Sequence, residues 1–172
     1  FGGRVQISKL EVESPFSSVP SVKLDALFRD IDLEQASETF AFGRISGTLE
    51  GTLNELVMTA GQPSQFRADV SSTEKRGVNQ RISVESLNKI TVLSSGNDAG
   101  ALYGGIAGFF DSFRYSKLGF KATLKNDKLS LRGVESRGDS EYLVVGSLLP
   151  PSVNVVSHTQ AIAFTELLRR LE

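Results

Sequence analysis

The side chains that most often perform chemistry in proteins are scarce in this chain. Its 172 residues include one histidine and no cysteine, which excludes a thiolate nucleophile, a cysteine zinc site and a histidine-rich metal site. The single histidine, His158, stands just before an expected helix, where a turn or capping role is the simpler interpretation. Catalysis or metal binding would need several convergent groups around it. No motif near His158 supplies them, and we expect neither a metal nor another cofactor.

Acidic residues in the first quarter of the chain are the next candidates for chemistry. The run from Asp30 to Glu34 looks superficially like a calcium loop, but it lacks the glycine and the final glutamate at the required offsets. A short helix over residues 32–38 explains the run better, because Asp suits the start of a helix and Glu its first turn. An enzyme built from the scattered carboxylates Asp25, Asp30 and Asp32 stays open as a hypothesis.

Motifs for phosphate binding and for an activated serine are missing. No GxGxxG, GxxxxGK[ST] or GxSxG pattern occurs. The 19 Lys and Arg residues balance 20 Asp and Glu residues, so the net charge of −1 supplies no field that would attract a polyanion. Lys75, Arg76 and Arg81 have few aromatic neighbours and are typical of a solvated surface. We expect no nucleic-acid partner and favour a binding or structural role over an enzymatic one.

Hydrophobic residues at every second position predict strands through much of the chain. Val5 and Ile7, then Leu10 and Val12, then the run from Val22 to Phe28 follow this spacing. Between Ile7 and Leu10 the apolar phase shifts by one residue, which predicts a bulge or a turn that exchanges the two faces of the strand. These strands are expected to be half buried, with one apolar and one polar face.

The stretch from Gly43 to Leu53 alternates most regularly and is expected to form one strand. Its apolar face would carry Ile45, Gly47, Leu49, Gly51 and Leu53. Glycine inside a strand indicates a bend or a close approach to the backbone. A curved sheet packed on a helix is the favoured interpretation, and a ligand lying against the glycines is the alternative.

Longer-period patterns predict helices in the second half. One apolar stripe predicts a central helix over residues 98–113, with Leu102, Ile106, Phe109 and Phe113 in the stripe. Apolar residues between Thr159 and Leu171 predict a closing amphipathic helix. Residues 84–93 fit a strand or a helix.

Between the two helices, alternating residues on both sides of the polar turn 125–128 predict a hairpin, with Phe120, Leu124, Leu129 and Leu131 on one face.

Several of these stretches together resemble a known family. Residues 40–51, preceded by residues 31–35, resemble the unit of the AsmA-like superfamily of bacterial envelope proteins in which a short helix precedes alternating glycines. Residues 107–118, which lead into the hairpin, are similar to the C-terminal portion of YdbH-type proteins, a branch related to TamB. The likeness covers residues 22–149. The continuation 134–138 departs from the YdbH pattern, which more often has a Gly-x-Asn-Pro turn there.

The resemblance implies a function and a location. Such proteins are anchored in the inner membrane by an N-terminal helix, which would be missing from this chain, and cross the periplasm as a trough-shaped sheet that shields phospholipid acyl chains. This chain would form the end near the outer membrane, where a small outer-membrane lipoprotein is engaged. The chain opens on Phe1 without an initiator Met or a signal-peptide pattern, so we expect it to begin inside a longer protein. The resemblance implies that it is a C-terminal fragment of a longer envelope protein.

We therefore expect a single β-rich domain of the α+β class over residues 1–172. Its sheet would be strongly curved, mostly antiparallel and trough-like, packed by the central helix and the C-terminal helix. The candidate lipid-facing or core residues are Ile45, Gly47, Leu49, Gly51, Leu53, Phe120, Leu124, Leu129 and Leu131. A groove wall and a core wall carry the same pattern, so both interpretations stay open.

The expected function is a non-enzymatic segment of a periplasm-spanning bridge that shelters or transports phospholipid between the inner and outer membranes. A trough needs an apolar interior, because each buried CH₂ of an acyl chain contributes about 0.8 kcal/mol. The alternative is a structural or protein-interaction module of the cell envelope that acts by β-strand addition.

Overall fold

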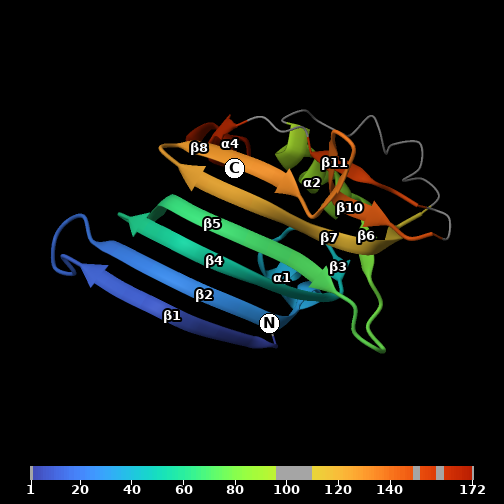
Figure 1. The fold of residues 1–172 in the computed structure, drawn as a ribbon, viewed down its shortest axis with the longest axis horizontal. Helices are drawn as coiled ribbons and strands as arrows, with labels where there is room; N and C mark the ends of the chain where they lie inside the picture. The colour runs from blue at the N-terminus through green and yellow to red at the C-terminus, as the bar shows by residue number, and fades with distance from the viewer. Residues whose placement is uncertain (1, 96–109, 149–151, 158–160, 172) are drawn as a thin grey trace.

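Antiparallel strands make up most of the structure. A computed structural model describes residues 2–95, 110–148, 152–157 and 161–171. These residues form a 12-stranded sheet with three short helices, α1 (Leu33–Thr39), α2 (Val84–Ser95) and α4 (Phe164–Leu171) (Figure 1). The alternation of apolar and polar residues predicted this class of fold, because it suits a sheet with one buried and one solvated face.

The first part of the sheet is a meander. Strands β1 (Arg4–Glu13), β2 (Ser21–Asp32), β4 (Thr48–Thr59) and β5 (Gln62–Thr73) lie side by side in that order, each antiparallel to its neighbours. Between β2 and β4 the chain forms helix α1 (Leu33–Thr39) and the short strand β3 (Ile45–Ser46). Strand β1 lies at one end of the strand order (Figure 1).

The second part of the sheet is organised around the long strand β7 (Ser112–Lys125). Its first half pairs with β6 (Arg81–Ser83) and β10 (Ser140–Gly146), and its second half pairs with β5 and β8 (Lys128–Gly133). The remaining elements are short and add to this framework: β9 (Glu135–Arg137), β11 (Val155–Ser157), β12 (Ile162–Ala163), α2 (Val84–Ser95) and α4 (Phe164–Leu171).

Three local predictions are confirmed. The register of β1 against β2 shifts between Ile7 and Lys9, as the change of apolar phase indicated. Helix α1 begins where expected, because the Asp32 carboxylate accepts the first free N–H groups of the helix. The β7–β8 hairpin turns through Asn126 and Asp127, which have φ of 52° and 59°. Asn and Asp tolerate this left-handed conformation, which suits a two-residue turn between twisted strands.

The predicted central helix is wrong at its C-terminal end. Residues 98–109 lie outside the described part of the structure, but Phe113 is a buried residue of strand β7. A spacing of four residues matches one turn of a helix and also two repeats of a strand, so the apolar stripe could not separate the two. The ambiguous segment 84–93 belongs to a helix instead, because α2 covers Val84–Ser95.

Two element boundaries also differ from the predictions. The stretch from Gly43 to Leu53 is interrupted at Gly47, whose φ of 142° separates β3 from β4. The interruption lets β3 pair with β6 while β4 pairs with β2 and β5. The closing helix begins only at Phe164, because residues 162 and 163 extend beside β8 as strand β12.

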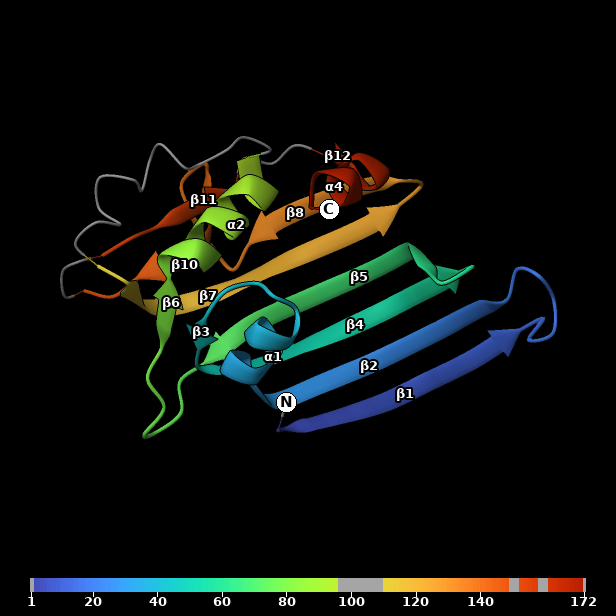
Figure 2. The same ribbon diagram turned by 180° about the vertical axis from the view of Figure 1, so that it is seen from behind.

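The core lies beneath the helices, on one face of the sheet. The larger cluster joins α1 and α2 to strands around β7 and β10, and it includes Leu33, Ile45, Ile82, Leu87, Phe113, Tyr115, Leu118, Leu143, Val144 and Val155. A smaller cluster beneath α4 contains Ala122, Leu124 and Leu129. Figure 2 shows α2 and α4 over the part of the sheet around β7, β8 and β10, whereas much of the meander carries no helix.

Candidate functional site

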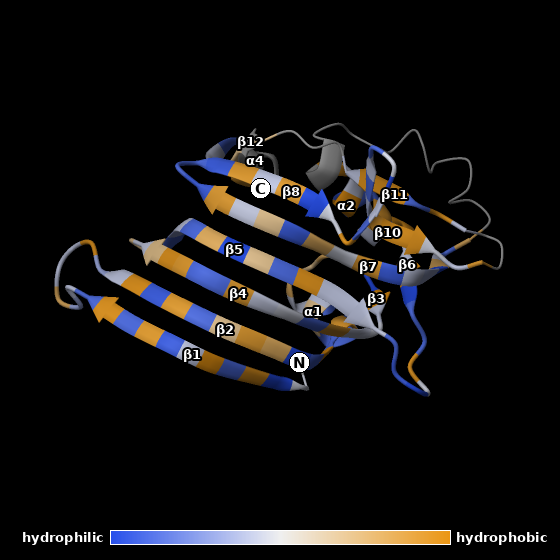
Figure 3. Cartoon of the chain, in the orientation of Figure 1, coloured by the Kyte–Doolittle hydropathy of each residue, from blue (hydrophilic) through white to orange (hydrophobic). Residues whose placement is uncertain are grey.

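One face of the sheet carries apolar side chains in continuous rows. Residues that pair directly across antiparallel strands project to the same side, so the register identifies each row. The clearest row crosses six strands through Ile7, Ala26, Leu53, Ala68, Ala122 and Leu131. A parallel row contains Val5, Phe28, Gly51, Val70, Phe120 and Gly133. The alternation that produces these rows is visible along the strands in Figure 3.

Further apolar pairs extend this surface toward the β1–β2 and β4–β5 turns. Leu10 pairs with Leu24 and Val12 with Val22, and these residues of β2 pair with Leu56 and Met58. Toward β8, on the same face of the sheet, Phe66 pairs with Leu124 and Leu124 pairs with Leu129. We call this whole surface, from β1 to β8, the apolar face.

The opposite face is polar and carries ion pairs between neighbouring strands. Lys121 lies 3.4 Å from Asp69 across β5 and β7, and Arg132 lies 2.9 Å from Glu141. The Arg132 guanidinium and the Gly133 N–H both donate hydrogen bonds to Glu141, and they lower the pKa of its carboxyl group. The two faces of the sheet therefore differ sharply in polarity.

Helices cover only part of the apolar face. Ala122, Leu124 and Leu129 are buried, with Phe164 of α4 packed against them. On β1 the side chains of Val5, Ile7, Leu10 and Val12 are instead 53%, 55%, 60% and 52% exposed. Their neighbours on β2 and β4, Val22, Leu24, Phe28, Leu53, Leu56 and Met58, are half-buried. We call these ten residues the open part of the apolar face.

The residues predicted from the sequence divide between the core and the surface. Ile45, Leu124 and Leu129 are buried core residues. Leu49 and Leu131 are half-buried and pack against the larger core cluster. Leu53 is half-buried in the open part of the apolar face, and Phe120, on the same face, is 38% exposed. The sequence pattern placed these residues on one surface without separating the covered from the open positions.

Gly47 and Gly51, the two glycines among the predicted site residues, lie close to other parts of the same chain. A Cβ on Gly51 would lie 2.6 Å from the carbonyl oxygen of Asp69 in β5. A Cβ on Gly47 would overlap the hydroxyl oxygen of Tyr115, which donates a hydrogen bond of 2.8 Å to the Ser46 carbonyl. Burial raises the pKa of Tyr115, so the phenol keeps the proton that it donates. The neighbouring strand and this ring account for both glycines.

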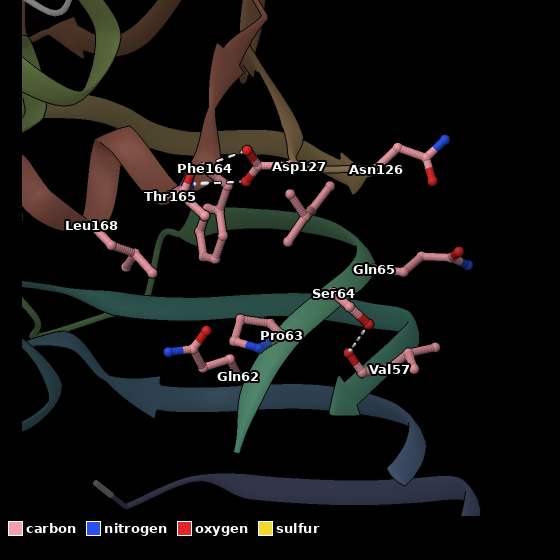
Figure 4. Close-up of a pocket in the computed structure, with 11 residues that line it drawn as sticks. Val57, Gln62, Pro63, Ser64, Gln65, Asn126, Asp127, Phe164, Thr165 and Leu168 are labelled. Carbon is pink, nitrogen blue, oxygen red and sulfur yellow. Dashed lines mark hydrogen bonds between the residues drawn. The ribbon is translucent and has the colours of Figure 1, made fainter. Parts of the chain in front are cut away.

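A hollow lies where α4 meets the ends of β4 and β5. Its volume is about 590 Å³, and its apolar lining includes Val57, Pro63, Leu124, Phe164 and Leu168 (Figure 4). Its lining also contains polar residues, among them Gln62, Gln65, Asn126 and Asp127. The hollow borders the apolar face at Leu124, so it extends the surface available to an apolar ligand.

Helix α4 is held in place by the turn between β7 and β8. The backbone N–H and the hydroxyl of Thr165 donate hydrogen bonds of 3.0 and 2.9 Å to the Asp127 carboxylate (Figure 4). The ring of Phe164 meets that of Phe66 edge to face, with 6.5 Å between their centroids. A carboxylate at the first turn of a helix is stabilised by the helix dipole, so these contacts determine which part of the apolar face α4 covers.

The scattered carboxylates each have a separate structural partner. Asp25 accepts a hydrogen bond of 2.6 Å from the backbone N–H of Glu55, at an irregularity in β4. Asp30 forms a 2.9 Å ion pair with Lys75, whose hydrogen bond lowers the pKa of the carboxyl group. Asp32 caps α1. These three residues do not share a hydrogen-bond partner, and His158 lies outside the described residues.

The apolar residues of β1 and β2 were not among the predicted site residues. Val5, Ile7, Leu10 and Val12 carried the same alternation as the chosen strands, so the pattern to find them was present. The missing information was three-dimensional, because the sequence does not show that α4 lies over β8 and leaves β1 uncovered.

Comparison of the chain with protein-family models, with curated proteins and with solved structures yields no match. Within the described residues, no helix has the length and apolar character to cross a membrane.

Proposed function

We propose that the apolar face binds the acyl chains of phospholipids, and that the chain is a non-enzymatic segment of a periplasm-spanning bridge. In this proposal the bridge shelters or transports phospholipid between the inner and outer membranes. The main support for this proposal is the open part of the apolar face. There, four side chains of β1 are more than half exposed, and they lie beside half-buried apolar residues of β2 and β4.

The polarity of the surface supports a hydrocarbon ligand. The rows of the apolar face continue from β1 to β8 through apolar residues and glycine. Large exposed apolar patches are uncommon on soluble proteins and mark interaction sites. An acyl chain gains about 0.8 kcal/mol for each CH₂ that it buries, and a ligand of this kind needs no polar partner along its length.

The proposed arrangement in the cell follows from the resemblance of the sequence to AsmA-like envelope proteins. The sheet would curve into a trough with the apolar face inside. The longer protein would be anchored in the inner membrane by an N-terminal segment, and the trough would extend through the periplasm. A small outer-membrane lipoprotein would be engaged at the far end.

Lipid retention tests the proposal directly. The protein is purified from a bacterial host without detergent, and bound phospholipid is measured by native mass spectrometry and by lipid analysis after organic extraction. We expect phospholipid at a defined stoichiometry with the unaltered chain. Phe120→Asp should reduce that amount severalfold, because it places a charge on the apolar face where acyl chains would lie.

The matched control is Phe16→Asp, in the exposed loop between β1 and β2. Phe16 is fully exposed and lies outside the apolar face, so this variant should retain as much lipid as the unaltered protein. Circular dichroism must show that both variants are folded. Lipid-free protein, or an equal loss of lipid in the two variants, would contradict acyl-chain binding on the apolar face.

Among the described residues, no strand pairs with the outer edge of β1. This edge favours a second candidate function, a protein-interaction module of the cell envelope that adds a strand from a partner. Edge strands present unpaired backbone N–H and C=O groups to such partners. Pull-down with the protein as bait would separate the candidates, since partner capture without phospholipid favours the interaction module.

A further inference from the structure

Strand β1 lies at one end of the sheet, and its outer edge is long and uncovered in the described part of the structure. All ten of its residues are exposed, and its pairing partner among the described residues is β2 alone. The strand contains no proline. Figures 1 and 2 show no described helix or loop lying along the outer side of β1. An edge of this kind can pair with another strand through its backbone.

The sequence of β1 is complementary to itself in the antiparallel direction. With Arg4 placed opposite Glu13 of a second copy, the apolar residues meet one another: Val5 faces Val12 and Ile7 faces Leu10. The polar residues also meet, with Gln6 opposite Glu11 and Ser8 opposite Lys9. The two-fold axis of this arrangement passes between residues 8 and 9.

The register shift in β1 makes this pairing possible. In a regular strand, residues seven positions apart project to opposite faces, so Val5 and Val12 could not both lie on the apolar face. The shift between Ile7 and Lys9 returns them to one face, where they pair with Phe28 and Val22 of β2. Because the shift lies at the two-fold axis, both strands change phase at the same place.

The charges select this register and this direction. Arg4 at one end of β1 and Glu13 at the other would form two opposite-charge pairs in the antiparallel dimer. A shift by one residue would place Val5 opposite Glu11 or Glu13. Parallel pairing in register would place Arg4 against Arg4 and Glu13 against Glu13, which is unfavourable.

We propose that β1 pairs antiparallel with β1 of a second copy of this chain, about a two-fold axis between residues 8 and 9. The pairing joins the two sheets and makes their apolar faces continuous. It satisfies the unpaired backbone groups of both edges and places the exposed Val5, Ile7, Leu10 and Val12 of each copy beside apolar neighbours. This inference does not rest on lipid binding, because it follows from the edge and the sequence of β1.

Disulfide trapping tests the register. The chain has no cysteine, so the double variant Val5→Cys, Val12→Cys carries only the introduced thiols. Within one copy these positions lie roughly 23 Å apart along an extended strand, too far for a disulfide. We expect covalent dimers after mild oxidation. The control is Val5→Cys, Glu11→Cys, whose thiols lie on opposite faces of the sheet in the proposed register, and we expect little dimer.

Sedimentation equilibrium of cysteine-free variants tests the forces involved. Ile7→Lys should abolish the dimer, because a lysine on the apolar face would oppose Leu10 of the second copy. Arg4→Glu should weaken the dimer about tenfold by creating like-charge pairs. The charge exchange Arg4→Glu, Glu13→Arg should restore it. Val19→Lys, in the exposed loop after β1, is the matched control and should leave dimerisation unchanged.

The outcomes separate this inference from the proposed function. A dimer that is trapped in the predicted register and is lost with Ile7→Lys supports the inference, whether or not phospholipid is bound. A monomer at every soluble concentration overturns it, and so does a dimer that survives Ile7→Lys. Capture of a strand from a different protein by β1, in place of a second copy, also overturns it.

Discussion

Gly47 and Tyr115 should be energetically coupled, and a double-mutant cycle measures this coupling. Gly47 has φ of 142°, in a region that side-chain-bearing residues rarely adopt, and it separates β3 from β4. The Tyr115 hydroxyl occupies the space that a Cβ on Gly47 would need. Gly47→Ala therefore imposes two separate costs, a backbone strain and a steric overlap, and only the second depends on the tyrosine hydroxyl.

The expected magnitudes follow from these two costs. Backbone strain at such a position costs about 1–3 kcal/mol, and overlap in a packed region costs about 1–3 kcal/mol more. Tyr115→Phe removes one partly buried hydrogen bond, to the Ser46 carbonyl, and should cost about 1 kcal/mol. In the double variant the overlap is relieved, because the next ring atom of Tyr115 is at ordinary contact distance, 3.5 Å, from the added Cβ.

Urea unfolding of the four proteins provides the test. The double variant should be more stable than the sum of the single effects indicates, with a coupling free energy of about 1–2 kcal/mol. Additive single effects, within about 0.5 kcal/mol, would refute the steric explanation for Gly47. They would leave the backbone conformation as the only reason for glycine at this position.

Two further predictions follow from the burial and the charge of other side chains. Because the pKa of Glu141 is lowered, its ionised carboxylate stabilises the fold above the ordinary carboxyl pKa of 4.5, and this contribution is lost as the pH falls through the lowered value. Glu141→Gln should therefore flatten the acid side of the curve of unfolding free energy against pH. An unchanged slope would exclude this contribution of Glu141 to stability. Leu124→Ala should lower the free energy of unfolding by about 2–5 kcal/mol, because Leu124 is buried. Ile7→Ala, at a mostly exposed position, should change the unfolding free energy of the monomer by less than about 0.5 kcal/mol. Similar losses in the two variants, measured by urea unfolding at a concentration where the protein is monomeric, would contradict the assignment of β1 to the open part of the apolar face.

The sequence predicted the parts of this fold that depend on nearby residues. The bulge after Ile7, the cap at Asp32 and the turn at Asn126 and Asp127 all follow from local spacing and backbone preference, and the structure contains each of them. The same local reasoning identified the strands that form the apolar face, because alternation is a property of each strand alone.

Features that depend on distant contacts could not be predicted in this way. The strand at Phe113 has a spacing that also fits a helix, and only its pairing with β6 distinguishes the two. The break at Gly47 follows from the position of Tyr115, which is far away in the sequence. Which part of the apolar face is covered depends on the contact between Asp127 and Thr165. Each of these requires knowledge of the assembled sheet.

The position of β7 has a consequence for how the chain folds. In the meander, short turns join β1 to β2 and β4 to β5, and β2 reaches β4 through residues 33–47, which contain α1 and β3. Strand β7 must instead reach back across residues 74–111 to pair with β5, while it also pairs with β6, β8 and β10. Closing the longer loop costs more entropy, and distant pairings slow folding. Assembly of the two parts of the sheet into one cooperative unit therefore depends on the arrival of this single strand.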